Sequence, residues 1–213
     1  MKKQTVLLVV VATFACCSVS QAMLTGAQWL PSSCTNLTCN SQDFDGDAVS
    51  MTGTQLSMNT ARIVGTYTTD SPGDPTLFLG SSVDNDTGYV WDSYQVNVIM
   101  SVPFTFFGTP VVSTVPPDAW FLASTTAPTL QSSGPYTGKY EGTMIFSAGA
   151  PLGIGDVLFF NYAINFASST DYAFTQEMIP MYSQIPEPGM LALAGLGGLA
   201  LAFRLRRNSR TGA

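Results

Sequence analysis

Apolar and polar side chains alternate along several segments of the chain, and this alternation is the feature that most constrains the fold. In the segment that begins at Tyr94, the apolar side chains of one face alternate with polar ones of the other. Val96, Val98, Met100 and Val102 share one face, and Gln95, Asn97 and Ser101 share the other. The same period of two recurs at 140–146 and 157–167, with shorter candidates at 63–68 and 76–79. A period of two with β-branched and aromatic residues indicates half-buried strands. We therefore expect strands that each place one face against a core.

Turn residues separate these segments, and no stretch between the two termini shows a sustained helical stripe. Clusters of Pro, Gly, Asp and Asn lie at 72–75, 84–88, 116–118, 135–138 and 153–156. The cluster at 84–88 has the composition of an Asx-rich hairpin turn. Short strands with regular turns in a chain of 213 residues predict an all-β fold, either an antiparallel β-sandwich or a jelly roll.

The N-terminus has the three parts of a secretory signal. Lys2 and Lys3 precede an apolar stretch at 6–17, and Ser20-Gln21-Ala22 places small residues at the two positions that signal peptidase reads. This pattern predicts a helical signal peptide over 1–22. We expect cleavage between Ala22 and Met23, and an uncleaved anchor is the alternative.

The C-terminus carries a second hydrophobic segment. Pro186-Glu187-Pro188 precedes fifteen uncharged residues, 189–203, which would form a helix about 22 Å long at about 1.5 Å per residue. This is shorter than the usual span of about 20 residues, but local bilayer thinning and snorkelling side chains can supply the difference. Because the helix would be apolar all round, we predict a transmembrane helix over 189–203 rather than an amphipathic or buried helix. Three arginines would act as its membrane stop: Arg204, Arg206 and Arg207.

This tail resembles the PEP-CTERM sorting signal of Gram-negative bacteria. Pro186, Glu187 and Pro188 match its core, and the apolar run and arginines that follow, through residue 210, match its helix and basic end. The resemblance implies that a membrane-embedded exosortase, a cysteine protease or transpeptidase, recognises the motif. It also implies delivery to the cell envelope or the extracellular matrix, often alongside exopolysaccharide production. In this family the motif is a recognition element and not a catalytic one.

The charge distribution predicts the topology. Six of the eight bases flank the two hydrophobic segments, so the positive-inside rule places both ends in the cytoplasm and residues 23–185 outside. That segment, long enough for one domain with a core, holds thirteen acids against Arg62 and Lys139, a formal charge of −11. Such a surface disfavours nucleic acid. The expected partners are the export machinery, the inner membrane and the exosortase, with exopolysaccharide as a further candidate.

Two cysteines remain after the signal peptide is removed. Cys34 and Cys39 lie five positions apart, and an even pair in an exported chain predicts one disulfide. Closing so short a loop stabilises the protein by about 2 kcal/mol on the chain-entropy estimate. The bond would therefore hold a local turn more than the whole fold.

One acidic cluster has the spacing of a calcium loop. Asp43, Asp45 and Asp47 stand at alternate positions, as hard oxygen ligands around one ion require. The match to an EF-hand then fails, because Ala48 occupies the glycine position and Thr54 the position of the bidentate glutamate. Calcium bound by these three aspartates is one hypothesis and a solvated turn is the other. We expect no other cofactor.

The composition excludes most catalytic arrangements of residues. It contains no histidine, which excludes a Ser-His-Asp triad and an ordinary zinc site, and it has no glycine-rich phosphate loop. Glu141 and Glu177 could form a glycosidase pair. A cross-strand ion pair, in which Glu141 contacts a base on a neighbouring strand, is the simpler interpretation. Three tryptophans could form a sugar-stacking platform, but we favour core packing for them: Trp29, Trp91 and Trp120.

Two hypotheses about function follow. The first is a non-enzymatic structural or adhesive β domain of the cell envelope or matrix, sorted by its C-terminal tail and anchored in the membrane before processing. The alternative is a calcium-assisted module that binds or cleaves carbohydrate. We prefer the first, because only 10% of the residues are charged and no convergent set of polar residues is visible.

Overall fold

The computed structural model describes residues 24–46, 48–70, 75–166 and 171–182, and of residues 40–45, 148, 171 and 172 it describes the backbone alone. The predicted signal peptide and C-terminal helix lie outside these ranges. Within them, no helix is long and apolar enough to cross a membrane. The described strands are β1 (Leu24–Thr35), β2 (Leu37–Asp45), β3 (Ala48–Gln55), β4 (Ala61–Thr69), β5 (Thr76–Asn85), β6 (Trp91–Met100), β7 (Phe104–Val115), β8 (Trp120–Leu130), β9 (Tyr140–Leu152), β10 (Val157–Phe166) and β11 (Asp171–Met181).

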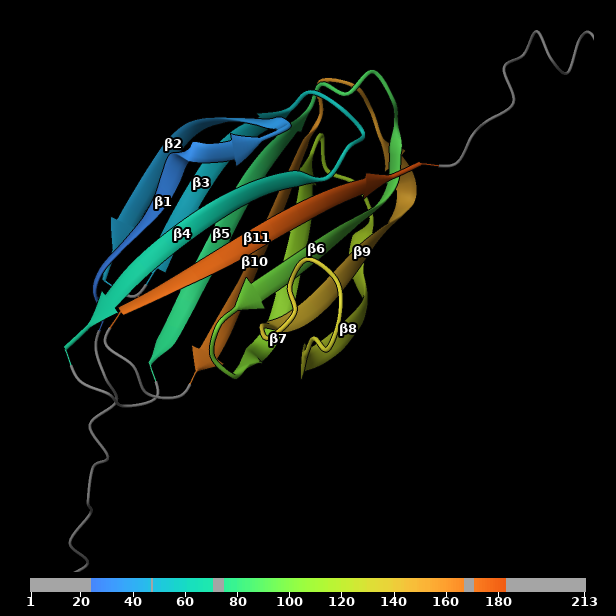
Figure 1. Cartoon of the computed structure of the whole chain (residues 1–213). Coiled ribbons are helices and arrows are strands. Elements are labelled where there is room, and N and C mark those ends of the chain that lie inside the picture. The colour runs from blue at the N-terminus through green and yellow to red at the C-terminus, as the bar shows by residue number, and fades with distance from the viewer. Residues whose placement is uncertain (1–23, 47, 71–74, 167–170, 183–213) are drawn as a thin grey trace, which may run out of the picture.

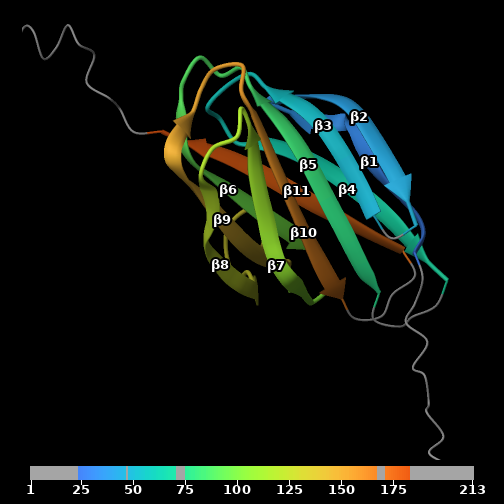
Figure 2. The ribbon, with the colours of Figure 1, turned by 180° about the vertical axis from the view of Figure 1, so that it is seen from behind.

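The strands form two sheets that pack face to face (Figure 1). One sheet has six strands in the order β1-β4-β11-β6-β9-β8, and the other has five in the order β2-β3-β5-β10-β7; Figure 2 shows the five-stranded sheet from outside. Neighbouring strands run antiparallel except β3 and β5, which are parallel. The predicted all-β antiparallel sandwich is therefore confirmed, with one parallel pair that the sequence did not predict.

Most connections carry the chain from one sheet to the other. Among the described strands, only β2–β3 and β8–β9 are consecutive neighbours within one sheet. The β1–β2 turn closes one side of the sandwich and the β7–β8 turn closes the other, since each joins the edge strands of the two sheets. The hairpin predicted at 84–88 is wrong for this reason: this turn joins β5 and β6, which belong to different sheets.

The 84–88 turn nevertheless has the expected Asx chemistry. Asn85 is fully buried, and its Oδ1 accepts hydrogen bonds from the Thr87 backbone nitrogen at 3.2 Å and from Thr87 Oγ1 at 2.8 Å. Its Nδ2 donates to the carbonyl oxygens of Tyr89 at 2.8 Å and Gly153 at 2.9 Å. One buried amide thus joins the β5–β6 turn to the β9–β10 turn. It satisfies backbone carbonyls in both turns, and a buried carbonyl without a hydrogen bond would destabilise the fold.

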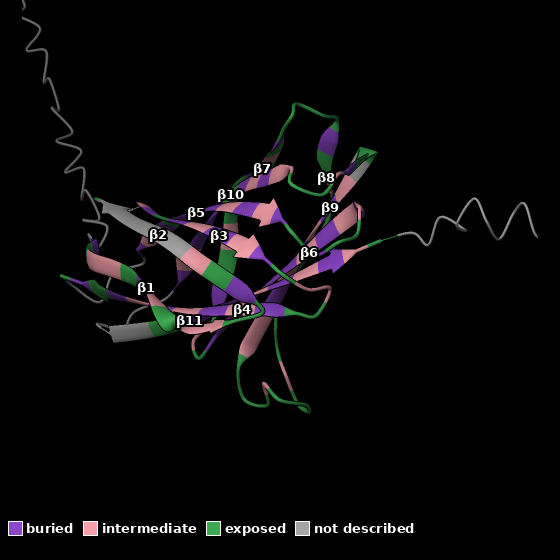
Figure 3. Cartoon of the chain, turned by 90° about the horizontal axis from the view of Figure 1, so that it is seen from above, coloured by how far each residue is buried: buried purple, intermediate pink, exposed green. Residues whose placement is uncertain are grey.

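The core lies between the inner faces of the two sheets (Figure 3). The predicted alternation appears in β6, β9 and β10, and the shorter predicted strands are parts of β4 and β5. Phe160 of the five-stranded sheet contacts two rings of the six-stranded sheet, with centroid distances of 5.9 Å to Tyr94 and 5.7 Å to Phe146. Each inward ring removes a large apolar area from water, so these faces supply most of the driving force for folding.

Buried polar side chains also join the two sheets. Gln176 of β11 is fully buried; its Oε1 accepts a hydrogen bond from the Tyr162 hydroxyl at 2.6 Å, and its Nε2 donates to Ser81 Oγ at 3.1 Å. Tyr162 and Ser81 lie on β10 and β5 of the opposite sheet. Because each buried polar group here has a partner, the inward glutamine avoids the cost of an unsatisfied amide.

Candidate functional site

The sorting motif directly follows the sandwich. β11 ends at Met181 and the last described residue is Tyr182, so Pro186, Glu187 and Pro188 begin a few residues beyond the last strand. These three residues lie outside the described ranges. The same holds for the predicted membrane stop, Arg204, Arg206 and Arg207, and for the predicted cleavage site at Ala22 and Met23.

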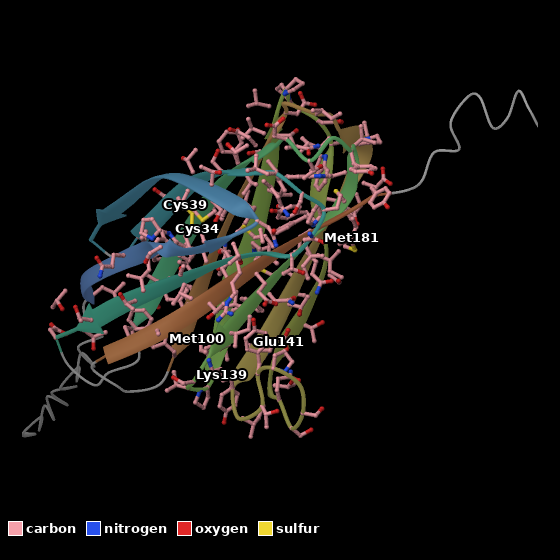
Figure 4. All side chains as sticks on the ribbon, turned by 45° about the horizontal axis from the view of Figure 1, so that its top comes forward. Cys34, Cys39, Met100, Lys139, Glu141 and Met181 are labelled. Carbon is pink, nitrogen blue, oxygen red and sulfur yellow. A yellow bond between two sulfur atoms is a disulfide. The ribbon has the colours of Figure 1, made fainter. Side chains whose placement is uncertain are left out.

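The predicted disulfide is present at the β1–β2 corner. Cys34 and Cys39 are bonded, with their Cα atoms 6.7 Å apart (Figure 4). Between them Asn36 adopts a positive φ of 55°, which asparagine tolerates better than most residues, and its Nδ2 donates to the Thr60 carbonyl oxygen at 2.9 Å. The bond therefore holds the turn that joins the edge strands of the two sheets.

The predicted calcium residues lie at the β2–β3 hairpin. In backbone register Asp43 pairs with Ser50 and Asp45 pairs with Ala48 on β3. The side chains of Asp43 and Asp45 and all of Asp47 lie outside what the structure describes, so calcium binding stays a hypothesis. Among the described side chains, no group of three acids or cysteines gathers as a metal site would require.

The three tryptophans belong to the core. Trp29, Trp91 and Trp120 are 1%, 0% and 7% exposed. The indole nitrogen of Trp91 donates to Thr87 Oγ1 at 3.1 Å. The preferred interpretation, core packing, is confirmed, and a tryptophan platform for sugars is excluded.

A cluster of charged residues lies on the outer face of the six-stranded sheet. Arg62 of β4 pairs in register with Glu177 of β11, and Glu141 lies on β9, two strands further along the same sheet (Figure 4). The β8–β9 loop covers them, and its Tyr136 hydroxyl donates a hydrogen bond to the Glu177 carboxylate. The Arg62 guanidinium and the Lys139 ammonium lie 5.9 Å and 6.0 Å from the Tyr136 ring centroid, within the range of cation–π contacts. Both bases of segment 23–185 and one of its two glutamates therefore contact one tyrosine.

The electrostatics of this cluster raise two pKa values. Burial, the hydrogen bond to Glu177 and the negative charge of Glu177 raise the pKa of Tyr136 to about 12. Burial and the like charge of Glu177 raise the pKa of Glu141 above its ordinary value of 4.5. The strongest charged neighbour of Glu141 is thus another carboxylate and not a base. The cluster can hold the β8–β9 loop on the sheet, and it also brings two carboxylates into electrostatic contact.

A second feature, a groove, lies on the outer face of the five-stranded sheet. It has a volume of about 560 Å³ and is lined by β3, β5, β7 and β10. Its centre is a row across three strands, in which Ala163 of β10 pairs with Phe78 of β5 and with Phe107 of β7. Phe78 and Phe107 are 41% and 57% exposed, whereas Ala163 is 5% exposed. Two aromatic rings therefore flank a floor made by a small residue.

The next row of the groove supplies polar groups. Asn161 pairs with Gly80 on one side and with Val111 on the other, and Ser50 pairs with Gly80. A Cβ atom added at Gly80 would lie 2.9 Å from Asn161 Oδ1, so the glycine leaves the space that this amide occupies. The exposed side chains of Asn161 and Ser50 offer both donors and acceptors to a ligand.

Sequence reasoning did not identify this groove, although one signal was present. Phe78 lies in a predicted strand between Leu77 and Leu79, on the side that should be polar. A large aromatic residue on the solvent side, followed by Gly80, marks a position where the strand pattern is broken. The contribution of Phe107 from β7 could not be seen, because the pairing of β10 with both β5 and β7 is a property of the tertiary structure.

Comparison with known proteins identifies the C-terminal segment. Residues 184–207 match the PEP-CTERM protein-sorting motif, which confirms the resemblance based on residues 186–210. A motif of this kind implies that the protein is exported, anchored through its C-terminus before processing, and processed by an exosortase. No curated protein shows a significant similarity to the chain.

Proposed function

Because the chain carries an exosortase sorting motif behind a closed β-sandwich, we propose that it is a structural or adhesive component of the cell envelope or the extracellular matrix. The sandwich is the cargo, and the C-terminal segment directs it to the exosortase and holds it at the inner membrane until it is processed. The cargo works by presenting its surface and performs no catalysis.

One observation carries this proposal: the sorting motif starts at residue 184, immediately after the last strand ends at Met181. A link this short leaves no room for another domain between the sandwich and the motif. A membrane-embedded enzyme that acts on the motif would therefore act beside a folded, compact domain. The disulfide at the β1–β2 corner also suits a protein that works outside the cytoplasm.

The geometry of the charged cluster supports a non-enzymatic role. Glu177 accepts the hydrogen bond of the Tyr136 hydroxyl, and both Arg62 and Lys139 lie against the Tyr136 ring. These contacts hold the β8–β9 loop in place over the sheet. A carboxylate engaged in this way is less available as a nucleophile than a free one.

The test compares the processing of the full chain with that of a variant in which Pro186, Glu187 and Pro188 are all alanine. Both are expressed in a host with an exosortase, and the intact mass of the product is measured. We expect the natural chain to lose its C-terminal arginines and the variant to keep them. Pro135→Ala, which changes an exposed proline of the β8–β9 loop, is the matched control and should be processed normally. Loss of the arginines from both the natural chain and the triple variant, or from neither, would contradict the proposal.

One observation favours the alternative, a carbohydrate-cleaving module. Glu141 and Glu177 lie close enough for the charge of Glu177 to raise the pKa of Glu141, and a raised pKa suits the general acid of a glycosidase pair. The alternative would displace the first proposal if the purified protein released reducing ends from a polysaccharide and its Glu177→Gln variant did not.

A further inference from the structure

We propose that the groove on the outer face of the five-stranded sheet binds a neutral polysaccharide, with sugar rings packed against Phe78 and Phe107. This inference rests on the proposed function in one respect, because a protein meets such polymers only after export. It assigns the adhesive surface to one face of the sandwich and names the class of partner.

The spacing of the two rings suits a chain of sugars. Phe78 and Phe107 lie on β5 and β7, which are separated by β10 alone, so their strands are about 10 Å apart at about 4.8 Å per strand spacing. That distance accommodates two hexose rings laid end to end. The floor between them, Ala163, is small enough to let a flat ligand approach both rings. The groove volume of about 560 Å³ falls in the range of ligand sites, about 300–1,000 Å³.

The chemistry of the groove combines apolar and neutral polar groups, as a sugar ring does. The C–H face of a pyranose packs on an aromatic ring, whose face carries partial negative charge. The hydroxyl groups at its edge need both donors and acceptors, which the exposed side chains of Asn161, Ser50 and Thr109 offer. A purely apolar partner would leave the Asn161 amide without a partner on binding, at a cost in affinity.

Charge selects a neutral polymer over an anionic one. None of the described side chains that line the groove is charged. Asp43 and Asp45, whose side chains lie outside the description, pair in backbone register with Ser50 and Ala48 at the edge of the groove, and acids there would also oppose an anionic ligand. Both bases of segment 23–185 lie against Tyr136, in the β8–β9 loop over the other sheet. With a formal charge of −11 for this segment, an anionic polysaccharide would be repelled. The same repulsion opposes the pairing of two copies through this face.

The test measures binding of the full chain, extracted with its termini in a mild detergent, to three immobilised probes. The probes are a neutral β-glucan, an apolar peptide and alginate, an anionic polysaccharide. We expect retention on the neutral glucan alone, with little change between low and high salt because no ion pair is formed. Preference for alginate or for the peptide, or no retention on any probe, would overturn the proposal.

Substitutions locate the site. Phe78→Ala and Phe107→Ala should each weaken binding to the neutral glucan about tenfold, because each removes one ring contact. Gly80→Ala should also weaken it, since the added Cβ would displace the Asn161 amide. The matched control is Phe121→Ala, which removes a ring 54% exposed on β8 of the other sheet and should leave binding unchanged.

Two further measurements keep the result interpretable. Fluorescence of the buried tryptophans reports whether each variant is folded, and only folded variants are compared. Sedimentation of the natural chain over a range of concentrations detects self-association; if Phe107→Ala abolished self-association and left glucan retention intact, the occupant of the groove would be a second copy and the proposal would be wrong. Processing of the C-terminal motif is read separately by mass, so loss of glucan binding with normal processing would overturn this inference alone.

Discussion

At the scale of single residues, the most unusual environment in the described structure is that of Glu141. It lies on an outer sheet face, where a carboxylate normally keeps its ordinary pKa, yet burial and Glu177 raise its pKa above 4.5. Tyr136 and Lys139 face the same cluster from the β8–β9 loop, and Arg62 faces it from β4. The electrostatic repulsion between the two carboxylates opposes folding. The contacts of Tyr136 with Glu177, Arg62 and Lys139 oppose that effect by holding the β8–β9 loop on the sheet.

This environment predicts a pH dependence of stability. Between pH 4.5 and the raised pKa of Glu141, the folded protein binds more protons at this group than the unfolded chain, so its contribution to stability falls as pH rises through that window. Glu141→Gln removes the titrating group, and we expect the stability of the variant relative to the natural protein to increase from pH 4 to pH 7. Urea unfolding at a series of pH values measures this.

The matched control for that experiment is Asp118→Asn, which removes a carboxylate from the exposed β7–β8 turn. Its stability relative to the natural protein should not follow the profile of Glu141→Gln. If the stabilities of Glu141→Gln and the natural protein changed in parallel over the whole range, burial and Glu177 would not raise the pKa of Glu141.

At the scale of elements, one set of paired residues shows how β1, β4 and β11 of the six-stranded sheet fit together. Gly65 of β4 pairs with Trp29 of β1 on one side and with Phe174 of β11 on the other. The two rings contact each other edge to face, with centroids 4.8 Å apart. The Trp29 and Phe174 rings can contact each other across β4 only because residue 65 has no side chain. A Cβ atom at this position would overlap the Phe174 ring.

Gly65→Ala should therefore destabilise the protein. Overpacking a core of this kind costs about 1–3 kcal/mol, and we expect a loss of about 2 kcal/mol in the free energy of unfolding, measured in urea by tryptophan fluorescence. Adding Phe174→Leu to Gly65→Ala should recover part of that loss, because the smaller side chain leaves room for the methyl group. Gly26→Ala is the control: its Cβ would lie 3.4 Å from Thr68 Oγ1, an ordinary contact. Equal effects of the two alanines would contradict this account of the paired residues.

At the scale of the whole molecule, the sandwich is built from strands that are distant in sequence. Because the chain changes sheets at nearly every described turn, neither sheet can form without the other. Gln176 is part of this dependence, since its amide joins β11 to Tyr162 and Ser81 of the opposite sheet. Contacts of such long range also predict slow folding for a domain of this size.

Gln176→Leu tests the polar link between the sheets. The substitution leaves the Tyr162 hydroxyl buried without its acceptor, which costs about 1–3 kcal/mol, and we expect a net loss of about 2 kcal/mol in urea unfolding. Adding Tyr162→Phe should restore about half of it, because both members of the pair are then apolar. The control is Gln28→Leu, which changes an exposed glutamine of β1 and should have little effect on the free energy of unfolding. A further loss on adding Tyr162→Phe would show that the hydroxyl has another role.

The sequence predicted β4, β5, β6, β9 and β10, in which apolar and polar residues alternate, but it did not predict β1, β2, β3 or β7. The central strands β6, β9 and β10 bury alternate side chains in the core, so their period of two was visible. β8 was not predicted, because this edge strand is exposed along most of its length. β11 was missed for a different reason: its inward positions include Gln176, which is polar and fully buried. The charged cluster and the groove could not be predicted, because each gathers residues from strands that are far apart in sequence.

The sorting signal was visible in the sequence alone, since such a signal is a local pattern of charge, proline and apolar length that other proteins recognise. The same is true of the Cys34–Cys39 bond, whose partners are five residues apart. Only the tertiary structure decided which surfaces the exported domain presents. Sheet order places Phe78 and Phe107 on either side of Ala163 and brings Glu141 near Glu177. Sheet order depends on which faces can be buried together, and no local sequence pattern records this.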